Sequence, residues 1–375
     1  MKRVIRGAIR HEEQGAVAIG ADGRIAWTGA AASLPPSWAS APADDFGRAI
    51  LMPGLIDAHI HFPQYRMLAA PGRDLLDWLT RFTFPEEARY ADRAYGARAA
   101  KIFLDRLFQH GTTAALAFCS VHSASAEALF AEAERRGMAL VTGKTMMDRN
   151  AMPEVQDEAE TGARESEALY RAWHGKGRLR YAVTPRFAIT STEAQLRLSG
   201  ELLAALPDAL MQTHLSESPG EIARVMELYP WARDYTDVYD RFGLLGPRSL
   251  FAHGIHLSER ECARLSETGS TVIHCPTSNS FLGSGIMRMA HMAKAERPVA
   301  IGVATDVGGG TSYSMLATLA EAYKLQMLAG YKPTATELFR LATRGNAARI
   351  GLGAEIGAIE VGKFADIAVL DPRAT

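Results

Sequence analysis

The sequence has few cysteines and no long hydrophobic run. Its three cysteines, Cys119, Cys262 and Cys275, are scattered along 375 residues, and an odd, widely spaced set does not resemble the disulfide framework of an exported domain. No apolar run approaches the roughly 20 residues that span a bilayer, and the N-terminal segment carries charges where a signal peptide is apolar. We therefore expect a cytoplasmic protein that is neither exported nor embedded in a membrane.

The chain also lacks an excess of charge of either sign. Lysine and arginine total 41 residues and aspartate and glutamate total 42, which leaves a formal net charge of -1. Without a basic stripe to neutralise phosphates, the composition argues against binding to nucleic acid or to a membrane surface. Apolar side chains, in contrast, make up 47% of the residues, enough to bury the core of one large domain.

Apolar, strand-like runs alternate with helical patterns along most of the chain. Runs that are apolar throughout suit parallel strands buried on both faces. The eight predicted strands are residues 50–61, 113–118, 138–142, 180–184, 210–214, 249–253, 271–275 and 298–306. Eight β/α units predict an α/β fold, a (β/α)8 TIM-like barrel, whose usual size of about 250 residues leaves room for a small accessory domain.

Capping signals mark helix ends between the strands. Thr190 with Glu193, and Ser258 with Glu261, fit the capping-box pattern, and Gly137 ends a run of apolar residues at helical spacing. We expect helices to begin after Thr190 and Ser258 and to end before Gly137.

Both ends of the chain depart from the barrel pattern. Strand-like runs at 4–9 and 16–27 come before the barrel, and strand-like alternation returns at 357–370. We therefore predict an accessory β domain built from both termini. The predicted parts are residues 1–50 and 351–375 for that domain and residues 51–350 for the barrel. The short terminal segments predict a truncated accessory domain, with an exposed edge or an edge covered by a second subunit in a homodimer.

Two histidines, His59 and His61, stand at the end of the first predicted strand. Residues i and i+2 of a strand point the same way, so both imidazoles can bind one metal ion. A His-x-His pair is also compatible with buried structural histidines. The position of the pair at the end of a strand favours a metal site, because barrel active sites form at the carboxyl ends of the strands.

Other strand ends supply further polar side chains. His214 is followed by Glu217, and His253 and Asp306 end two later strands. Nitrogen and oxygen donors of this kind suit Zn²⁺ or Fe²⁺ better than Ca²⁺ or Mg²⁺. The pattern predicts a metal site at one mouth of the barrel.

These motifs together resemble the amidohydrolase superfamily and, in detail, its guanine deaminase branch. The superfamily features are PGLIDAHIH, THLSE, AHGIHLS and TDVGGGTS. The features of the branch are HIHFPQ (59–64), LLDWL with FTFPEE (75–87), TPRF (184–187), HCPTSNSFLGSG (274–285) and TDVGGGTSYSML (305–316). The resemblance extends from about residue 50 to about residue 350. It implies an aminohydrolase acting on cyclic amidines, which converts guanine to xanthine and ammonia in purine catabolism or salvage.

The resemblance also implies a role for each site residue. It implies one Zn²⁺ per chain, with Fe²⁺ as the alternative, held by His59, His61, His214 and Asp306. The implied catalytic residues are Glu217, as general base and then acid, His253, which would hydrogen-bond the metal-bound water, and Asp306, as a second proton acceptor. The implied substrate-binding residues are His61, Gln64, Trp78, Arg186, Phe187, His214, Glu217 and Asp306.

Four of these side chains match a flat, polar heterocycle such as guanine. Gln64 offers a donor and an acceptor, and Arg186 offers a planar fork of donors for a carbonyl and a ring nitrogen. Phe187 or Trp78 can stack on the ring face. A site built in this way penalises bases that leave its polar groups unpaired.

Three alternatives remain open from the sequence. The first is deamination of another heterocycle, such as 8-oxoguanine, a pterin, an s-triazine or an adenosine derivative. The second is a two-metal site bridged by a carboxylated lysine, with Lys144 at the end of strand three as the candidate. Relatives usually take that lysine from strand four, so we expect one metal. The third is a non-catalytic barrel scaffold, which would have no physical need for the six metal-binding and catalytic side chains.

The remaining histidines and one glycine run are expected to be structural or to support the site, and Cys275 could in principle bind zinc. His256 and His274 lie near strand ends and are expected to support the site. Cys275 has no Cys-x-x-Cys companion, so the zinc signature of the nucleic-acid-editing deaminases is absent. The glycines at 308–310 are expected to form a tight turn after Asp306, because the spacing of a phosphate-binding loop is lacking. The histidines expected on loops, helix ends or the surface are His11, His110, His122, His174 and His291.

Overall fold

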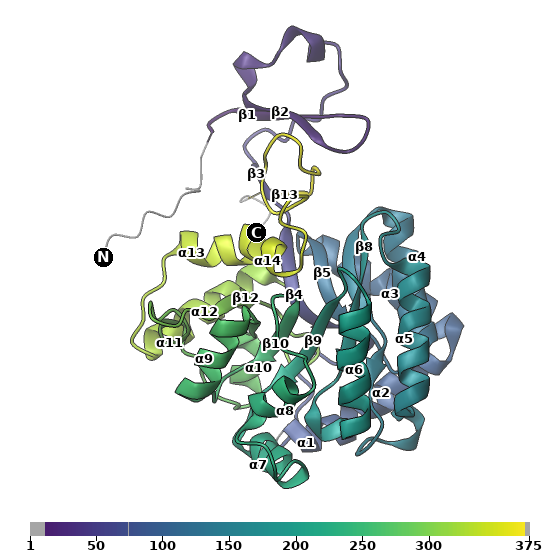
Figure 1. Cartoon of the computed structure of the whole chain (residues 1–375). Coiled ribbons are helices and arrows are strands. Elements are labelled where there is room, and N and C mark those ends of the chain that lie inside the picture. Colours follow the sequence, from purple (N-terminus) through teal and green to yellow (C-terminus); the bar gives the residue numbers. More distant parts are fainter. Residues whose placement is uncertain (1–11, 74, 372–375) are drawn as a thin grey trace.

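A computed structural model, which describes residues 12–73 and 75–371, contains a barrel of parallel strands surrounded by helices (Figure 1). The predicted strand at 4–9 lies outside the described residues. The eight barrel strands, in chain order, are β4 (Leu55–His61), β5 (Thr112–Phe118), β6 (Ala139–Gly143), β8 (Leu179–Pro185), β9 (Leu210–Leu215), β10 (Ser249–His253), β11 (Thr271–His274) and β12 (Ala300–Val303). The short β7 (Thr145–Met146) pairs only with β8. The predicted (β/α)8 barrel is therefore confirmed.

The barrel ladder runs from β4 to β12, and the side chain of Asn346 bridges the seam between these two strands. Its amide nitrogen donates to the carbonyl oxygens of Ile56 (2.6 Å) and Val303 (2.7 Å), and its amide oxygen accepts from the Val303 N–H (3.0 Å). Nearer the carboxyl ends, the Asp57 carboxylate accepts from the N–H (3.1 Å) and the hydroxyl (2.5 Å) of Thr305. These side-chain hydrogen bonds close the seam together with two backbone bonds, from the His61 N–H to the Val307 carbonyl oxygen (2.6 Å) and from the Asp306 N–H to the His59 carbonyl oxygen (3.0 Å).

Helices cover the outside of the barrel. The longer ones are α3 (Arg93–Gln109), α4 (Ser123–Arg136), α5 (Ala159–Trp173), α6 (Glu193–Ala205), α7 (Pro219–Leu228), α9 (Glu259–Thr268) and α12 (Met315–Leu328). The shorter ones are α1 (Leu75–Trp78), α2 (Phe84–Ala88), α8 (Tyr235–Arg241), α10 (Pro276–Phe281), α11 (Met289–Met292), α13 (Ala335–Arg340) and α14 (Asn346–Arg349). Within residues 12–73 and 75–371, no helix has both the length and the apolarity that crossing a bilayer requires.

The predicted helix ends are correct in two cases of three. Gly137 ends α4 in the left-handed conformation, with φ of 64°, and Ser258 with Glu261 forms the capping box of α9. The cap at Thr190 is wrong. The α6 helix is capped by Thr192, whose hydroxyl accepts from the backbone N–H of Gln195.

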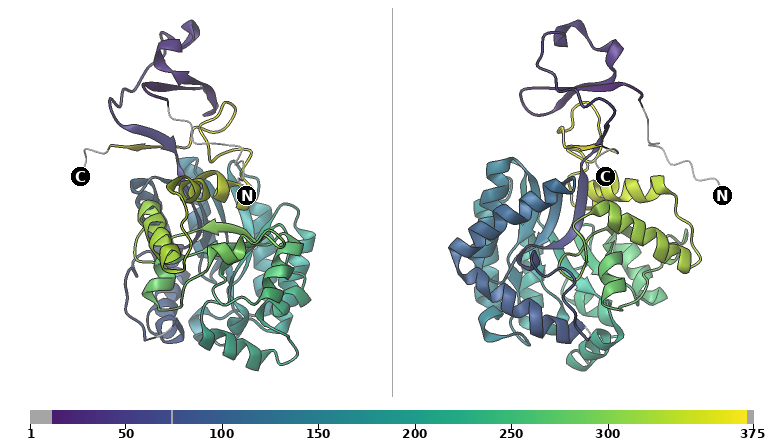
Figure 2. Two further views of the ribbon diagram at one scale, coloured as in Figure 1. Left: turned by 90° about the vertical axis from the view of Figure 1, so that its left-hand side faces the viewer. Right: turned by 180° about the vertical axis from the view of Figure 1, so that it is seen from behind.

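The accessory strands join the two ends of the chain. A hairpin of β1 (Gly15–Ile19) and β2 (Ile25–Ala30) lies beside a second antiparallel pair, β3 (Ile50–Pro53) with β13 (Ile367–Leu370) (Figures 1 and 2). An isolated bridge between Arg24 and Phe364 also connects the two termini. Because β3 leads directly into Leu55, these strands adjoin the amino end of β4, away from the carboxyl ends of the barrel strands.

Two strand predictions at the termini are wrong in extent. Residues 50–61 are not one strand, because the chain breaks at Gly54, where an added Cβ would meet the Thr113 hydroxyl oxygen at 2.0 Å. In the predicted run at 357–370, only β13 forms a strand, and turns occupy most of the rest.

The first barrel strand is buried along its whole length. Its apolar members, Ile56 and Ile60 among them, have no exposed surface. The same strand also buries Asp57, His59 and His61. Burying polar groups is unfavourable unless each of them finds a partner. The three polar side chains of β4 therefore need polar partners inside the barrel.

Candidate active site

The histidines of β4 meet Asp306, which follows β12, and His214 on β9. The Nε2 atoms of His59 and His61 each lie 3.3 Å from Asp306 Oδ1. His214 Nε2 lies 3.2 Å from His61 Nε2. Strand ends far apart in the sequence therefore converge at the carboxyl mouth of the barrel, as predicted for a metal site.

The backbone turns sharply at two of the converging positions. Asp306 has φ of 52° and His253 has φ of 71°, a left-handed conformation that is uncommon outside glycine and that concentrates at functional sites. After Asp306 the chain forms the tight turn expected of its glycines, and the Gly310 N–H donates to the Asp306 carbonyl oxygen at 2.5 Å. An added Cβ at Gly310 would meet the Thr305 carbonyl oxygen at 1.8 Å, so glycine is required there.

The protonation of the imidazoles suits metal binding. His214 Nδ1 donates to the Arg186 carbonyl oxygen (2.7 Å), which leaves its Nε2 lone pair facing His61. Burial lowers the pKa of His61 to about 3 and holds that of His214 well below its usual value, with the charges of His59 and His61 adding to the effect on His214. Neutral imidazoles are the form that binds a metal ion.

The carboxylate of the cluster stays ionised. Burial opposes ionisation of Asp306, but His59 and His61 beside it hold its pKa well below the usual value. The Nε2 atom of His59 is buried and, apart from its ion-pair contact with Asp306, finds no hydrogen-bond partner among the described residues. Three imidazole nitrogens and one carboxylate oxygen with unused lone pairs fit a divalent transition-metal ion.

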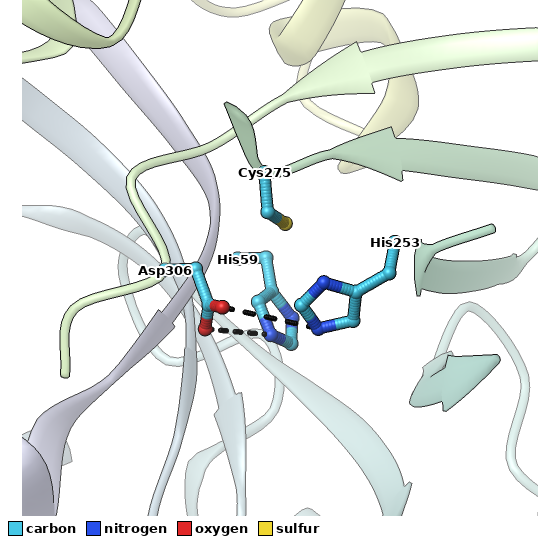
Figure 3. A group of neighbouring side chains, drawn as sticks. All are labelled: His59, His253, Cys275 and Asp306. Carbon is cyan, nitrogen blue, oxygen red and sulfur yellow. Dashed lines mark ion pairs between the residues drawn. The ribbon is translucent and has the colours of Figure 1, made fainter. Parts of the chain in front are cut away.

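Glu217 and His253 stand beside this cluster. His253 Nε2 lies 3.5 Å from Glu217 Oε2 and 3.8 Å from Asp306 Oδ2 (Figure 3 shows His253 beside Asp306). Burial, with the charge of Asp306, raises the pKa of Glu217 to about 8, although a hydrogen bond from the Ser284 hydroxyl (3.0 Å) opposes the rise. A carboxyl group of this kind can both accept and release a proton near neutral pH.

A pocket opens onto the cluster and contains every side chain predicted to bind substrate. The predicted residues that line it are His61, Gln64, Trp78, Arg186, Phe187, His214, Glu217 and Asp306. Leu75, Leu79, His253, Leu282 and Gly309 complete the lining. Because the lining combines polar side chains with aromatic and aliphatic ones, the pocket matches a flat heterocycle.

Three supporting residues were missed by the sequence reasoning. Asn279 Oδ1 accepts from His253 Nδ1 (2.9 Å), and the Ser284 hydroxyl donates to Glu217. Glu87, from the FTFPEE motif, binds both Arg186 and Gln64. The motifs at 75–87 and 274–285 contain all three, but no spacing rule separates them from their neighbours.

Cys275 also lies at the site. One ligand atom each from His59, His253, Cys275 and Asp306 all lie within 4.8 Å of one another (Figure 3). Burial raises the pKa of the Cys275 thiol well above its usual value. A cysteine without a Cys-x-x-Cys companion can therefore still lie next to the cluster of His59 and Asp306.

The side chain of Lys144 forms ion pairs away from the proposed metal ligands. The side chain is fully buried, and its Nζ pairs with Asp157 Oδ2 (2.7 Å) and Glu165 Oε2 (2.8 Å). Lys144 is also not among the described residues that line the pocket. The geometry thus gives no support to a lysine-bridged pair of metals.

The remaining histidines do not line the pocket. His256 Nε2 contacts the Ser284 carbonyl oxygen (2.8 Å) and so supports the loop that contacts Glu217. Burial lowers the pKa of His274 to about 3, and neither of its ring nitrogens has a hydrogen-bond partner. The histidines expected on loops, helix ends or the surface also lie outside the pocket lining where they are described, namely His110, His122, His174 and His291, whereas His11 lies outside the described residues.

The chain belongs to the amidohydrolase family, whose model matches residues 50–375. This family is metal-dependent, in keeping with the cluster of imidazoles and a carboxylate. Within it the chain belongs to the guanine deaminases, as its resemblance implied. Guanine deaminase of Escherichia coli (strain K12) is 46% identical over 332 residues, which cover 88% of this chain and 75% of that protein.

Solved structures agree with this placement. A structure of E. coli guanine deaminase has a TM-score of 0.92 at 42% identity, with 96% of this chain and 83% of that chain covered. Guanine deaminase from C. acetobutylicum, with guanine bound in the active site, has a TM-score of 0.88 at 29% identity, covering 96% and 86%. An adenosine deaminase from Xanthomonas campestris with bound zinc has a TM-score of 0.84 at 26% identity, covering 96% and 81%.

Proposed function

We propose that this chain hydrolyses guanine at C2 and releases xanthine and ammonia. The observation that carries the proposal is the pocket itself, whose lining contains both Gln64 and Arg186 and the proton-handling pair Glu217 and His253. Similarity to guanine deaminases over most of the chain supports the same reaction. The reaction places the enzyme in purine catabolism or salvage.

We assign one metal ion to His59, His61, His214 and Asp306. Zn²⁺ is the proposed ion, because nitrogen donors with one carboxylate are usual for catalytic zinc and a similar deaminase contains zinc. The same donors would accept Fe²⁺. When bound, the ion would lower the pKa of a water molecule from 15.7 to about 7, which makes it a nucleophile at neutral pH.

The side chains of the protein manage the protons. Glu217 takes a proton from the attacking water as its oxygen bonds to C2, and then passes that proton to the adjacent ring nitrogen. His253 orients the water, with its ring held by Asn279. Asp306 accepts the remaining proton of the former water molecule, from the hydroxyl group now bonded to C2, and transfers it to the amino group. The C2–N bond then breaks, and ammonia departs.

Recognition follows from the hydrogen-bonding capacity of the pocket. Arg186 presents free guanidinium N–H groups to the carbonyl and a ring nitrogen, and Gln64 presents one donor and one acceptor. Phe187 and Trp78 pack against the ring faces. Adenine lacks the carbonyl, so it would leave buried polar groups unpaired.

A substrate panel tests the proposal. Purified protein loaded with zinc should release ammonia from guanine, with xanthine identified by chromatography. The same assay with 8-oxoguanine, a pterin, an s-triazine and adenosine examines the alternative substrates. A value of kcat/KM for any of these that exceeds the guanine value by about tenfold would reassign the substrate. Absence of turnover on the whole panel would favour a scaffold.

We also propose that the enzyme works as a cytoplasmic homodimer without nucleic acid or membrane. The near-neutral charge supports the absence of a polyanionic partner. Exposed apolar side chains on α12, with Leu328 78% and Met327 44% exposed, support association between subunits. Sedimentation velocity gives the oligomeric state, and a monomer at micromolar concentration would contradict this part of the proposal.

A further inference from the structure

Glu87 has a fully buried carboxylate. It lies on α2, a short helix in the segment between the barrel strands β4 and β5. Both of its oxygens accept from Arg186 Nη1, at 2.9 Å and 2.8 Å, and Oε1 also accepts from Gln64 Nε2 at 2.9 Å. Arg186 and Glu87 have side-chain exposures of 3% and 0%. Glu87 itself does not line the pocket, so any effect on a ligand has to pass through its two partners.

These contacts fix what Gln64 offers to a ligand. Because its Nε2 donates to Glu87, its Oε1 faces the other way and accepts from the Gly308 N–H at 3.2 Å. A flipped amide would place its oxygen against the Glu87 carboxylate, which is repulsive. One N–H and one lone pair of Gln64 therefore remain in a fixed orientation.

The same carboxylate orients the guanidinium group of Arg186. With Nη1 engaged by Glu87, the N–H groups of Nε and Nη2 remain for a ligand. The backbone carbonyl of Arg186 accepts from His214 Nδ1, so the recognition side chain and a predicted metal ligand share one residue. The backbone of Glu87 is held in turn by the Ser120 hydroxyl, which donates to its carbonyl oxygen at 2.9 Å.

We infer that Glu87 is a positioning residue for substrate recognition, which holds Gln64 and Arg186 in the orientation that reads the carbonyl edge of the purine. The inference rests on the proposed function. Glu87 also balances the charge of Arg186 inside the protein, so the recognition pair presents directed donors to a neutral base without net charge. Losing Glu87 should therefore affect recognition of the carbonyl edge more than the chemical step.

The test compares E87Q with E86Q. Glu86 lies on the same helix, but its carboxylate accepts from Tyr95 (2.5 Å) and Arg89 (3.0 Å), and it does not line the pocket. KM and kcat for guanine are measured with the zinc-loaded enzymes. Binding of 2-aminopurine, which lacks the 6-carbonyl group, is measured as a competitive inhibition constant. Zinc content and melting temperature are recorded for each variant.

In E87Q we expect KM for guanine to rise about 30-fold or more and kcat to fall less than about fivefold. The inhibition constant of 2-aminopurine should change less than about threefold, because that ligand lacks the carbonyl that the two side chains read. Zinc content should stay at the wild-type level, and E86Q should match wild type throughout. A guanine KM within about twofold of wild type, or equal losses for both purines, would overturn the inference.

A second variant covers the case in which E87Q does not fold. E87D keeps the charge but shortens the side chain, so it should show a smaller loss of the same kind, with guanine affected more than 2-aminopurine. Equal effects on the two purines in E87D would overturn the inference. Wild-type turnover is measured first. A wild-type enzyme that is inactive on guanine would refute the proposed function, whereas an active wild type with an unselective E87Q would refute only the role of Glu87.

Discussion

The Nε2 atoms of His61 and His214 face each other at 3.2 Å inside the barrel. His214 uses its Nδ1 proton on the Arg186 carbonyl oxygen, so its Nε2 presents a lone pair. Two buried nitrogens at this separation are stabilised when a cation lies between them and Asp306. The first prediction follows from this pair.

Removing the metal should abolish turnover and also weaken the fold. Treatment with a chelator is expected to reduce kcat at least about 100-fold and to lower the melting temperature, because ligand binding to the native state stabilises it by mass action. Added Zn²⁺ should restore both properties. Elemental analysis of the treated protein is the control. Wild-type turnover in protein with less than about one tenth of an equivalent of metal would contradict this assignment.

Glu217→Gln should remove the proton shuttle and leave the metal in place. We expect kcat for guanine to fall about 10²- to 10⁴-fold, the usual contribution of general acid–base catalysis, at unchanged zinc content. Glu227→Gln is the matched control, because Glu227 is an exposed glutamate on α7 that pairs with Arg224. Near-normal turnover by metal-loaded Glu217→Gln would exclude the assignment.

Ser284→Ala should shift the pH profile. The Ser284 hydroxyl donates to Glu217 and so favours the ionised carboxylate. Without it the pKa of Glu217 rises, because a hydrogen bond to the charged form is lost. The base then becomes protonated at higher pH, and the acid limb of kcat/KM should move upward by about half a unit to one unit. Ser280→Ala, which loses contacts outside the pocket, should leave the limb in place. A shift to lower pH in Ser284→Ala would contradict the mechanism.

Asn346→Ala should destabilise the barrel. The substitution leaves the carbonyl oxygens of Ile56 and Val303 and the N–H of Val303 without partners at the seam. Buried groups without partners cost about 1 to 3 kcal/mol each, so the loss of three partners should lower the free energy of unfolding by at least about 3 kcal/mol. Urea denaturation gives the value, with the exposed Gln109→Ala as control. A change below about 0.5 kcal/mol would show that the seam does not depend on this side chain.

The barrel was predictable because its strands are buried on both faces. Continuous apolar runs such as 114–118 leave little ambiguity, and the period of two in a strand places His59 and His61 on one side. The break at Gly54 was not predictable from the run itself, because it depends on the close approach of Thr113, far away in sequence. The cap at Thr190 failed because Thr192, two residues later, provides the actual cap.

The residues of the site also fall into a group that could be predicted from the sequence and a group that could not. Residues at strand ends carry a positional signal, and the predicted substrate-binding set lines one pocket. Glu87 and Ser284 carry no such signal, because their roles consist of contacts with residues 99 and 67 positions away. The left-handed backbone at His253 and Asp306 was equally hidden, since nothing in those residue types favours it strongly enough to predict.

The seam of the barrel has a consequence for the order in which the site is built during synthesis. The first barrel strand provides His59 and His61, and Asp306 follows the last one. A nascent chain that ends before Asp306 holds imidazoles without the carboxylate that completes the donor set. From the proposed ligand set we therefore expect full metal affinity only when the last β/α unit has left the ribosome and closed against the first.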